Sequence, residues 1–178
     1  MLNPDEREEL LRLARAAIGS SLGLHSLAEA GLGAGLQRLA GAFVTLHHLD
    51  RLRGCIGYLE SDRPLVDVVA RCAVSASNAD PRFPPLARSE FPEITLEISV
   101  LGPIEPVADV NEIEIGRHGL IVQAGPARGL LLPQVATERG WNRETFLGYT
   151  CLKAGLASNA WKTGVLLFKF EAEVFGER

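Results

Sequence analysis

The strict alternation of apolar and polar residues in two stretches, 94–100 and 168–174, constrains the fold of this chain most. In the first stretch every second residue is apolar, with threonine, glutamate and serine between, and the second stretch repeats the pattern with lysine and glutamate. Successive side chains of a β-strand point to opposite faces of a sheet. Each stretch therefore predicts a strand with one face in the core and the other in water.

Segments with helical spacing lie between the predicted strands. Asn3 followed by a proline and two acidic residues is typical of a helix start, and the apolar spacing predicts that this helix ends near Gly19. A second apolar stripe predicts a helix opened by Pro64, with Ser61 or Asp62 as its cap. Both helices bury one face only.

Two hairpins complete the alternation of helices and strands. Residues 43–48 and 52–59 predict the first hairpin, and residues 119–123 and 130–132 predict the second. The other expected elements are a loop with a short helical piece (20–41), a rigid loop (80–85), a short helix (133–139) and a helix from Asn142 to Ala154. The chain is thus predicted to be an α+β protein.

Composition and charge indicate the size of the fold, the compartment and the classes of partner to expect. A chain of 178 residues with 47% hydrophobic content suits one globular domain, and its net charge of −4 provides no electrostatic footprint for duplex nucleic acid or an anionic membrane. Three widely spaced cysteines argue against a disulfide framework and for a reducing compartment. Because the first residues are charged and no apolar run could span a bilayer, we expect a cytoplasmic protein that binds no membrane.

The hexapeptide Leu-Arg-Gly-Cys-Ile-Gly at 52–57 carries the strongest hint of chemistry. Cys55 stands between Gly54 and Gly57 on a predicted strand, and glycines inside a strand mark a bulge or a place where another group comes close to the backbone. Arg53 would lower the pKa of the thiol if its guanidinium folded back. Free cysteines are also among the most often buried residues, so a packing role for Cys55 stays open.

The other candidate groups are few. Three prolines at 80–85 force a stiff loop that excludes helix and holds Asp80 and Arg82 in place. His118, between glycines at a strand edge, is a candidate base for a thiol, although a lone surface histidine is commoner. The helical positions of Cys72 and Cys151 predict that both are core residues. No Cys-x-x-Cys or His-Glu-x-x-His pattern is present, so no metal site is predicted.

Together these motifs resemble the AMMECR-one domain family, whose bacterial and archaeal members are called AmmeMemoRadiSam system protein A. The similarity covers nearly the whole chain and follows the order of the family. The matching segments are LRGCIG (52–57), DPRFPP (80–85), HGL (118–120), LLPQVA (131–136), GW (140–141) and TCLKAGL (150–156) followed by Trp161.

The resemblance implies a fold, partners and a site, but no established activity. It implies two unequal lobes of antiparallel sheet with packed helices, a larger lobe built from both ends of residues 1–178 and a smaller inserted one. It also implies a radical SAM protein and a Memo-like protein as partners. Apart from the resemblance, no cofactor is predicted. It places the family's most characteristic motif and its rigid loop on Arg53, Gly54, Cys55, Ile56, Gly57, Asp80, Arg82 and Phe83.

The first functional hypothesis is a cysteine-centred enzyme or redox-active protein. Cys55 would be the nucleophile or redox thiol and His118 its base, while Arg53 and Arg82 would hold an anionic or carbonyl group through paired donors.

The second hypothesis is a non-catalytic binding or accessory module. Gly54 and Gly57 would let a partner's backbone come close, and the proline-stiffened loop with Asp80, Arg82 and Phe83 would dock it. Nucleic-acid modification in company with a radical SAM enzyme is a weaker third hypothesis, because direct binding of nucleic acid by an acidic protein is not expected.

Overall fold

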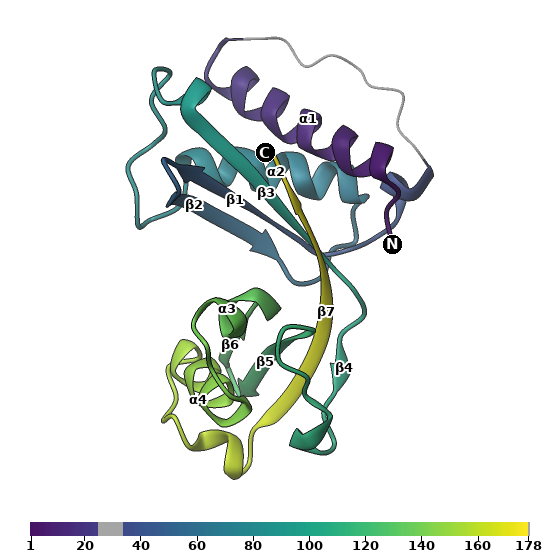
Figure 1. The fold of residues 1–178 in the computed structure, drawn as a ribbon, viewed down its shortest axis with the longest axis vertical. Helices are drawn as coiled ribbons and strands as arrows, with labels where there is room; N and C mark the ends of the chain where they lie inside the picture. The colour runs from purple at the N-terminus through teal and green to yellow at the C-terminus, as the bar shows by residue number, and fades with distance from the viewer. Residues whose placement is uncertain (25–33, 178) are drawn as a thin grey trace. The chain divides into compact units, whose positions relative to one another are not determined.

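The computed structural model describes residues 1–24 and 34–177; residues 25–33, part of the stretch expected as a loop with a short helical piece, lie outside the described residues. The elements, shown in Figure 1, are α1 (Pro4–Ser21), β1 (Ala42–His48), β2 (Arg51–Tyr58), α2 (Leu65–Asn78), β3 (Ile94–Leu101), β4 (Glu105–Pro106), β5 (His118–Ala124), β6 (Ala127–Leu131), α3 (Pro133–Glu138), α4 (Arg143–Lys153) and β7 (Leu166–Gly176). Short 3₁₀ turns lie at Ala34–Gln37, Phe91–Glu93, Val110–Glu112 and Ala160–Lys162. The predicted α+β class is confirmed, and no described helix is long and apolar enough to cross a membrane.

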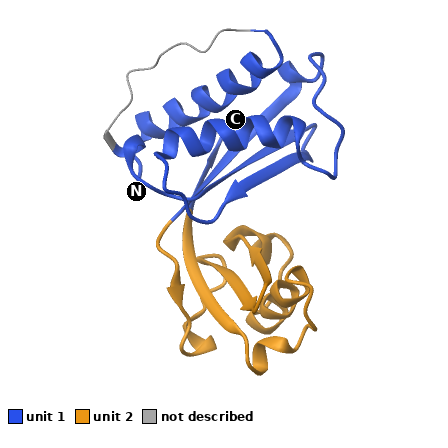
Figure 2. Cartoon of the chain, turned by 180° about the vertical axis from the view of Figure 1, so that it is seen from behind, with its two compact units in different colours: residues 1–101, 173–178 blue, residues 102–172 orange. Residues whose placement is uncertain are grey.

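The chain divides into two compact units, coloured separately in Figure 2. Unit 1 consists of residues 1–101 and 173–178, and unit 2 of residues 102–172. The strand order is β2-β1-β3-β7-β5-β6, with β4 paired to β7, and the pairs with a described register are antiparallel. Because β7 runs from residue 166 to residue 176, it contributes to both units.

Unit 1 is a sheet with helices on one face. Figure 2 shows α1 and α2 in front of the strands, and the apolar residues of that face form one buried core. Val44 of β1 lies between Ile56 and Ile98 of its neighbours, so the three strands turn matching apolar rows toward the helices. The opposite face carries the row Cys55, Thr45 and Glu97. The candidate cysteine thus lies on the sheet face away from the helices.

The first two helices begin differently. The Asn3 side chain accepts a hydrogen bond from the Glu6 backbone and Glu6 reciprocates, which confirms the predicted start of α1. The expected cap of α2 is wrong, because Pro64 occupies the cap position and no side chain caps this helix. The Ser61 hydroxyl instead accepts a hydrogen bond from the backbone N–H of Arg63, in the turn before the helix.

Two glutamates, Glu173 in β7 and Glu177 just after it, tie the end of the chain to its beginning. Both Glu173 oxygens accept from the backbone N–H of Leu2, at 3.0 and 3.2 Å, and Arg7 also donates to this carboxylate. Glu177 accepts from Arg15 at 2.6 Å and from the backbone N–H of Leu96 at 2.9 Å. Unit 1 is therefore closed by residues more than 150 positions apart in sequence.

Unit 2 is built around the β5–β6 hairpin, against which α4 packs. Its core is a small cluster of buried residues that includes Leu120, Phe146 and Leu147. Asn142 caps α4 by accepting from the Thr145 backbone at 2.9 Å, as its sequence predicts. Thus each unit has an apolar core of its own.

We predict that Gly54→Ala destabilises the protein by about 3 kcal/mol, at the upper end of the range for overpacking. A methyl group at this position would overlap the carbonyl oxygen of Ala76 in α2, and both are backbone positions that cannot rotate away. Gly102→Ala is the matched control, because the nearest atom to its added methyl group is 3.4 Å away, an ordinary contact distance. Urea unfolding of both variants tests this; equal losses would contradict it.

Candidate functional site

The predicted site lies on β2, the edge strand of the sheet, beside a β-bulge. In the hairpin register His47 pairs with Leu52 and Leu46 pairs with Gly54, so Arg53 has no partner position on β1. Bulges bend an edge strand and redirect a side chain, and they often occur next to functional sites. Here the bulge sets Thr45 directly opposite Cys55.

The carboxylate of Asp80 holds this edge in place. Asp80 is only 3% exposed, and its Oδ2 accepts from the backbone N–H of Cys55 at 2.9 Å. Its oxygens also accept from the backbone and side chain of Arg82, with the closest contact at 2.6 Å. Hydrogen bonds from the Arg82 side chain, followed by those from the two backbone N–H groups, hold the pKa of Asp80 well below its usual range.

The loop itself begins with a tight turn rather than a fully extended strand. The Phe83 N–H donates to the Asp80 carbonyl at 3.1 Å, with Pro81 at the position where its fixed φ favours a turn. Helix is absent from this loop, as the prolines predict. Farther on, the backbone of Leu86 bonds to Ser77 at 2.7 Å, so the loop is fixed at both ends.

The Arg53 side chain forms an ion pair with the carboxylate of Glu90. Its guanidinium donates twice to Glu90, at 2.8 and 3.0 Å, and once to the Pro84 carbonyl at 3.0 Å. The Arg53 side chain, followed by the Ala87 backbone N–H, lowers the pKa of Glu90 to about 2. The expectation that Arg53 lowers the pKa of Cys55 is therefore wrong: Arg53 instead braces the edge strand against the proline loop.

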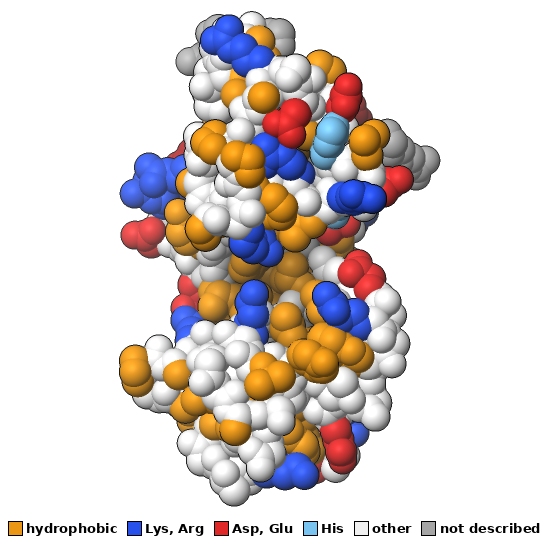
Figure 3. Space-filling view, turned by 90° about the vertical axis from the view of Figure 1, so that its left-hand side faces the viewer, with side chains coloured by type: hydrophobic (Ala, Val, Ile, Leu, Met, Phe, Trp, Pro, Cys, Tyr) orange, Lys and Arg blue, Asp and Glu red, His pale blue; other side chains and the backbone are white. Residues whose placement is uncertain are grey.

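Two guanidiniums lie over one aromatic ring beside Cys55. The Arg53 and Arg82 guanidinium carbons are 5.9 and 5.5 Å from the centre of the Phe83 ring. The Arg82 side chain is 50% exposed, and its Nη1 makes no hydrogen bond within residues 1–24 and 34–177. Figure 3, which faces the side where β2 lies, shows basic side chains among hydrophobic ones on unit 1. We call Arg53, Cys55, Arg82 and Phe83 the arginine–phenylalanine surface.

The thiol of Cys55 is not activated in this arrangement. Burial raises the pKa of the Cys55 thiol, and the nearby Asp80 and Glu97 carboxylates act in the same direction. The Thr45 hydroxyl, which donates to Sγ at 3.3 Å, and the charge of Arg82 oppose this rise without overcoming it. The resting side chain is therefore a partly exposed, neutral thiol.

The glycines beside Cys55 are explained by packing within unit 1. The missing side chain of Gly54 makes room for the backbone of α2, and that of Gly57 makes room for the Phe43 ring on β1. The predicted close approach therefore exists, and the approaching groups belong to this chain. A role for either glycine in binding stays a prediction.

His118 lies in unit 2 and Cys55 in unit 1, so nothing in either unit brings them together. His118 is buried, and its Nδ1 accepts from the Glu114 backbone at 3.0 Å, which leaves the proton of a neutral ring on Nε2. A ring held in this way has no free lone pair for a thiol proton. The proposed base role of His118 stays a prediction without support from this geometry.

The other two cysteines, Cys72 and Cys151, lie in the cores of the protein. Cys72 and Cys151 are both fully buried, as predicted, and burial raises the pKa of Cys72 to about 12. All three cysteines are free thiols. Among the described residues no three His, Cys, Asp or Glu side chains are arranged to hold a metal ion.

Two partners at the site were missed by sequence reasoning. Thr45 was missed because the glycines beside Cys55 mark a bulge or a close approach without fixing which residue of β1 lies opposite the cysteine. Glu90 was missed because 37 positions separate it from Arg53.

We predict that Asp80→Asn lowers the free energy of unfolding by about 2 kcal/mol near neutral pH, because hydrogen bonds to a charged acceptor are lost. The folded pKa of Asp80 is depressed, so its contribution is complete above its ordinary value of 3.8 and is lost as the pH falls below that value. The difference between wild type and Asp80→Asn should therefore shrink in acid. Urea unfolding across this pH range measures it.

The control is Asp50→Asn, at an exposed position in the turn between β1 and β2. Its stability should track that of the wild type at every pH. A deficit for Asp80→Asn that stays constant in acid would show that the carboxylate is not what holds the loop.

The comparisons with known proteins agree with this fold. A sequence model of the AMMECR1 family matches residues 11–175. A protein of Methanothermobacter thermautotrophicus is 44% identical, covering 99% of this chain and 96% of its own length, and one of Methanopyrus kandleri is 46% identical, covering 99% and 90%. The crystal structure of the uncharacterized protein PH0010 from Pyrococcus horikoshii superposes with a TM-score of 0.94 at 38% identity, over 99% of this chain and 94% of that one. The chain therefore belongs to the AMMECR1 family.

Proposed function

We propose that this protein is a non-catalytic binding module that docks a protein partner through the arginine–phenylalanine surface. The observation that carries the proposal is the rigid presentation of Arg82 and Phe83: one side of the guanidinium is fixed by Asp80, and its Nη1 has no partner among the described residues. Arginine and aromatic side chains are enriched at the energetic centres of protein interfaces. A prepositioned side chain also loses less entropy on binding.

The same contacts define what kind of partner fits. The Nε and Nη2 groups of Arg82 already donate to Asp80, so Arg82 offers a partner its Nη1 donors, which can bond to a carboxylate oxygen, and the Phe83 ring offers an apolar face. The partner would therefore present an acidic side chain next to an apolar one. A radical SAM protein and a Memo-like protein, which the family resemblance implies as partners, are the candidates.

Addition of a β-strand is not the proposed mode of docking. The outward backbone N–H of Cys55 already donates to Asp80, and its carbonyl accepts from Arg82 at 3.4 Å. Side chains of the loop thus occupy the positions that a neighbouring strand would use, which is a common protection of sheet edges. Recognition at this point would therefore run through side chains.

We expect Arg82→Lys and Phe83→Ala each to weaken binding of the purified candidate partner by at least tenfold, a loss of about 1.4 kcal/mol. Lysine keeps a positive charge beside Asp80 while removing the Nη1 donors, and the backbone N–H groups at positions 55 and 82 still hold the Asp80 carboxylate. Cys55→Ser and Arg51→Ala, an exposed position on the same strand, should bind like the wild type. Titration calorimetry measures affinity, and urea unfolding confirms that each variant folds.

Loss of binding in Cys55→Ser alone, or unchanged binding in both the Arg82 and Phe83 variants, would contradict the proposal. The first result would point to the thiol, and the second would point to a different surface.

A cysteine enzyme is the second candidate, favoured by one observation. The Cys55 thiol is partly exposed, and the Thr45 hydroxyl donates to its sulfur, an arrangement that would stabilise a thiolate. Under this hypothesis, the partner would supply the remaining groups and shift the pKa downward.

Because burial raises its pKa, we expect Cys55 to alkylate more slowly than a free thiol near neutral pH. Mass spectrometry of the folded protein at several pH values measures the rate, with buried Cys72 and Cys151 as unreactive controls. Labelling faster than that of a free thiol, and slowed by Thr45→Val, would favour the enzyme over the binding module.

A further inference from the structure

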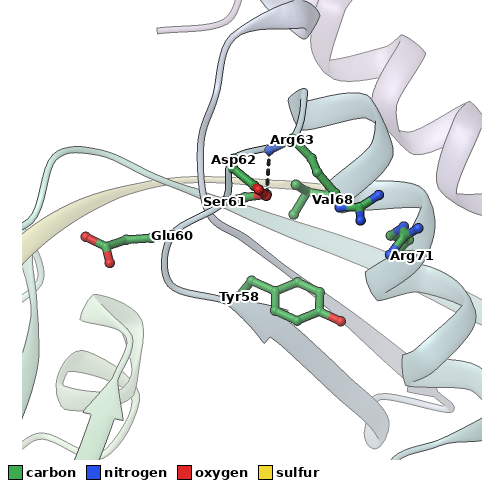
Figure 4. A pocket seen from close by; sticks show the side chains of 7 residues that line it. All are labelled: Tyr58, Glu60, Ser61, Asp62, Arg63, Val68 and Arg71. Atoms are coloured by element: carbon green, nitrogen blue, oxygen red, sulfur yellow. Dashed lines mark hydrogen bonds between the residues drawn. The ribbon is translucent and has the colours of Figure 1, made fainter.

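A second candidate site in unit 1 contains none of the residues of the arginine–phenylalanine surface. It is a pocket of about 410 Å³ where the end of β2 meets the start of α2, shown in Figure 4. This volume lies in the range of pockets that hold small molecules. The residues that line the pocket are Tyr58, Glu60, Ser61, Asp62, Arg63, Val68 and Arg71.

The basic groups of the pocket converge. Figure 4 shows the guanidinium groups of Arg63 and Arg71 on the same side of the pocket, next to Val68, with the Tyr58 hydroxyl directed to that side as well. Glu60 extends in the opposite direction. One end of the pocket is therefore rich in hydrogen-bond donors.

Neither arginine is neutralised by a described residue. Arg53 and Arg82 each bind a carboxylate, whereas within residues 1–24 and 34–177 the side chains of Arg63 and Arg71 make no ion pair or hydrogen bond. Two neighbouring guanidiniums repel each other, and an anion between them removes that repulsion. The arrangement is thus one that a bound anion would stabilise.

The backbone next to the pocket also favours a bound anion. The pocket residues Ser61, Asp62 and Arg63 precede Pro64, the N-cap of α2, and no side chain caps this helix. The start of a helix carries the positive end of its dipole and favours negative charge. The two carboxylates of the lining, Glu60 and Asp62, limit how much negative charge the pocket accepts, which favours a single oxyanion group over a polyphosphate.

We propose that this pocket binds a small ligand through one phosphate or carboxylate group, held by Arg63 and Arg71 with the Tyr58 hydroxyl as a third donor. The ring of Tyr58 and the side chain of Val68 would contact the apolar part of the ligand. The proposal is independent of partner docking at the arginine–phenylalanine surface, since the two share no residue.

The test is a titration of the protein with inorganic phosphate and, separately, with acetate, at constant ionic strength, followed by NMR of the backbone amides. We expect saturable shifts at residues 58–71, and the probe that binds more tightly identifies the preferred oxyanion. Arg63→Gln and Arg71→Gln should each weaken binding at least about tenfold, because a charge-assisted contact is lost. Tyr58→Phe should weaken it less.

Arg51→Gln is the matched control, because it removes one exposed positive charge from the same unit outside the pocket. It should leave the affinity unchanged. Absence of saturable shifts with both probes would overturn the proposal, as would equal weakening by Arg51→Gln, which would indicate general attraction to positive charge. Calorimetry with Arg82→Lys measures docking separately, so each proposal can fail alone.

Discussion

The buried carboxylate of Asp80 is the contact on which the rest of the site depends. It joins the backbone of the edge strand at Cys55 to the side chain of Arg82 and to the backbone of its own turn. A charge this buried is tolerated only when its oxygens are fully hydrogen-bonded, so the loop has one low-energy position. The orientation of Phe83 and the free side of Arg82 follow from that position, and so does protection of the sheet edge.

Local sequence patterns predicted the fold, but they did not predict the pairing register of β1 and β2 at the site. Alternation predicted β3 and β7, and Asn3 and Asn142 predicted helix starts. The two-residue turn at Leu49 and Asp50, both with positive φ, would alone pair Thr45 with Gly54. The bulge at Arg53 moves the pairing by one residue and brings Thr45 to Cys55 instead. A one-residue slip exchanges the faces of a strand, and no periodicity in the sequence encodes it.

The sequence also did not show which carboxylate pairs with Arg53. Arg53 would lower the pKa of Cys55 only if its guanidinium folded back, and it binds Glu90 instead. The glycines around Cys55 were correctly taken as marks of close approach, but the approaching groups are the Ala76 carbonyl and the Phe43 ring. In each case the deciding partner comes from another element of unit 1. Local sequence identifies which residues are unusual, whereas tertiary packing decides what they contact.

The link between Glu173 and the residues at the start of α1 has a consequence for how the chain is made. Synthesis runs from the N-terminus, so residues 102–172 of unit 2 emerge before the last segment of β7, which belongs to unit 1. Until Glu173 and Glu177 are present, Leu2, Arg7 and Arg15 lack their carboxylate partners, and until β7 is made β3 is paired only with β1. Synthesis of unit 1 therefore begins before that of unit 2 but ends after it, when all residues of unit 2 have already been made.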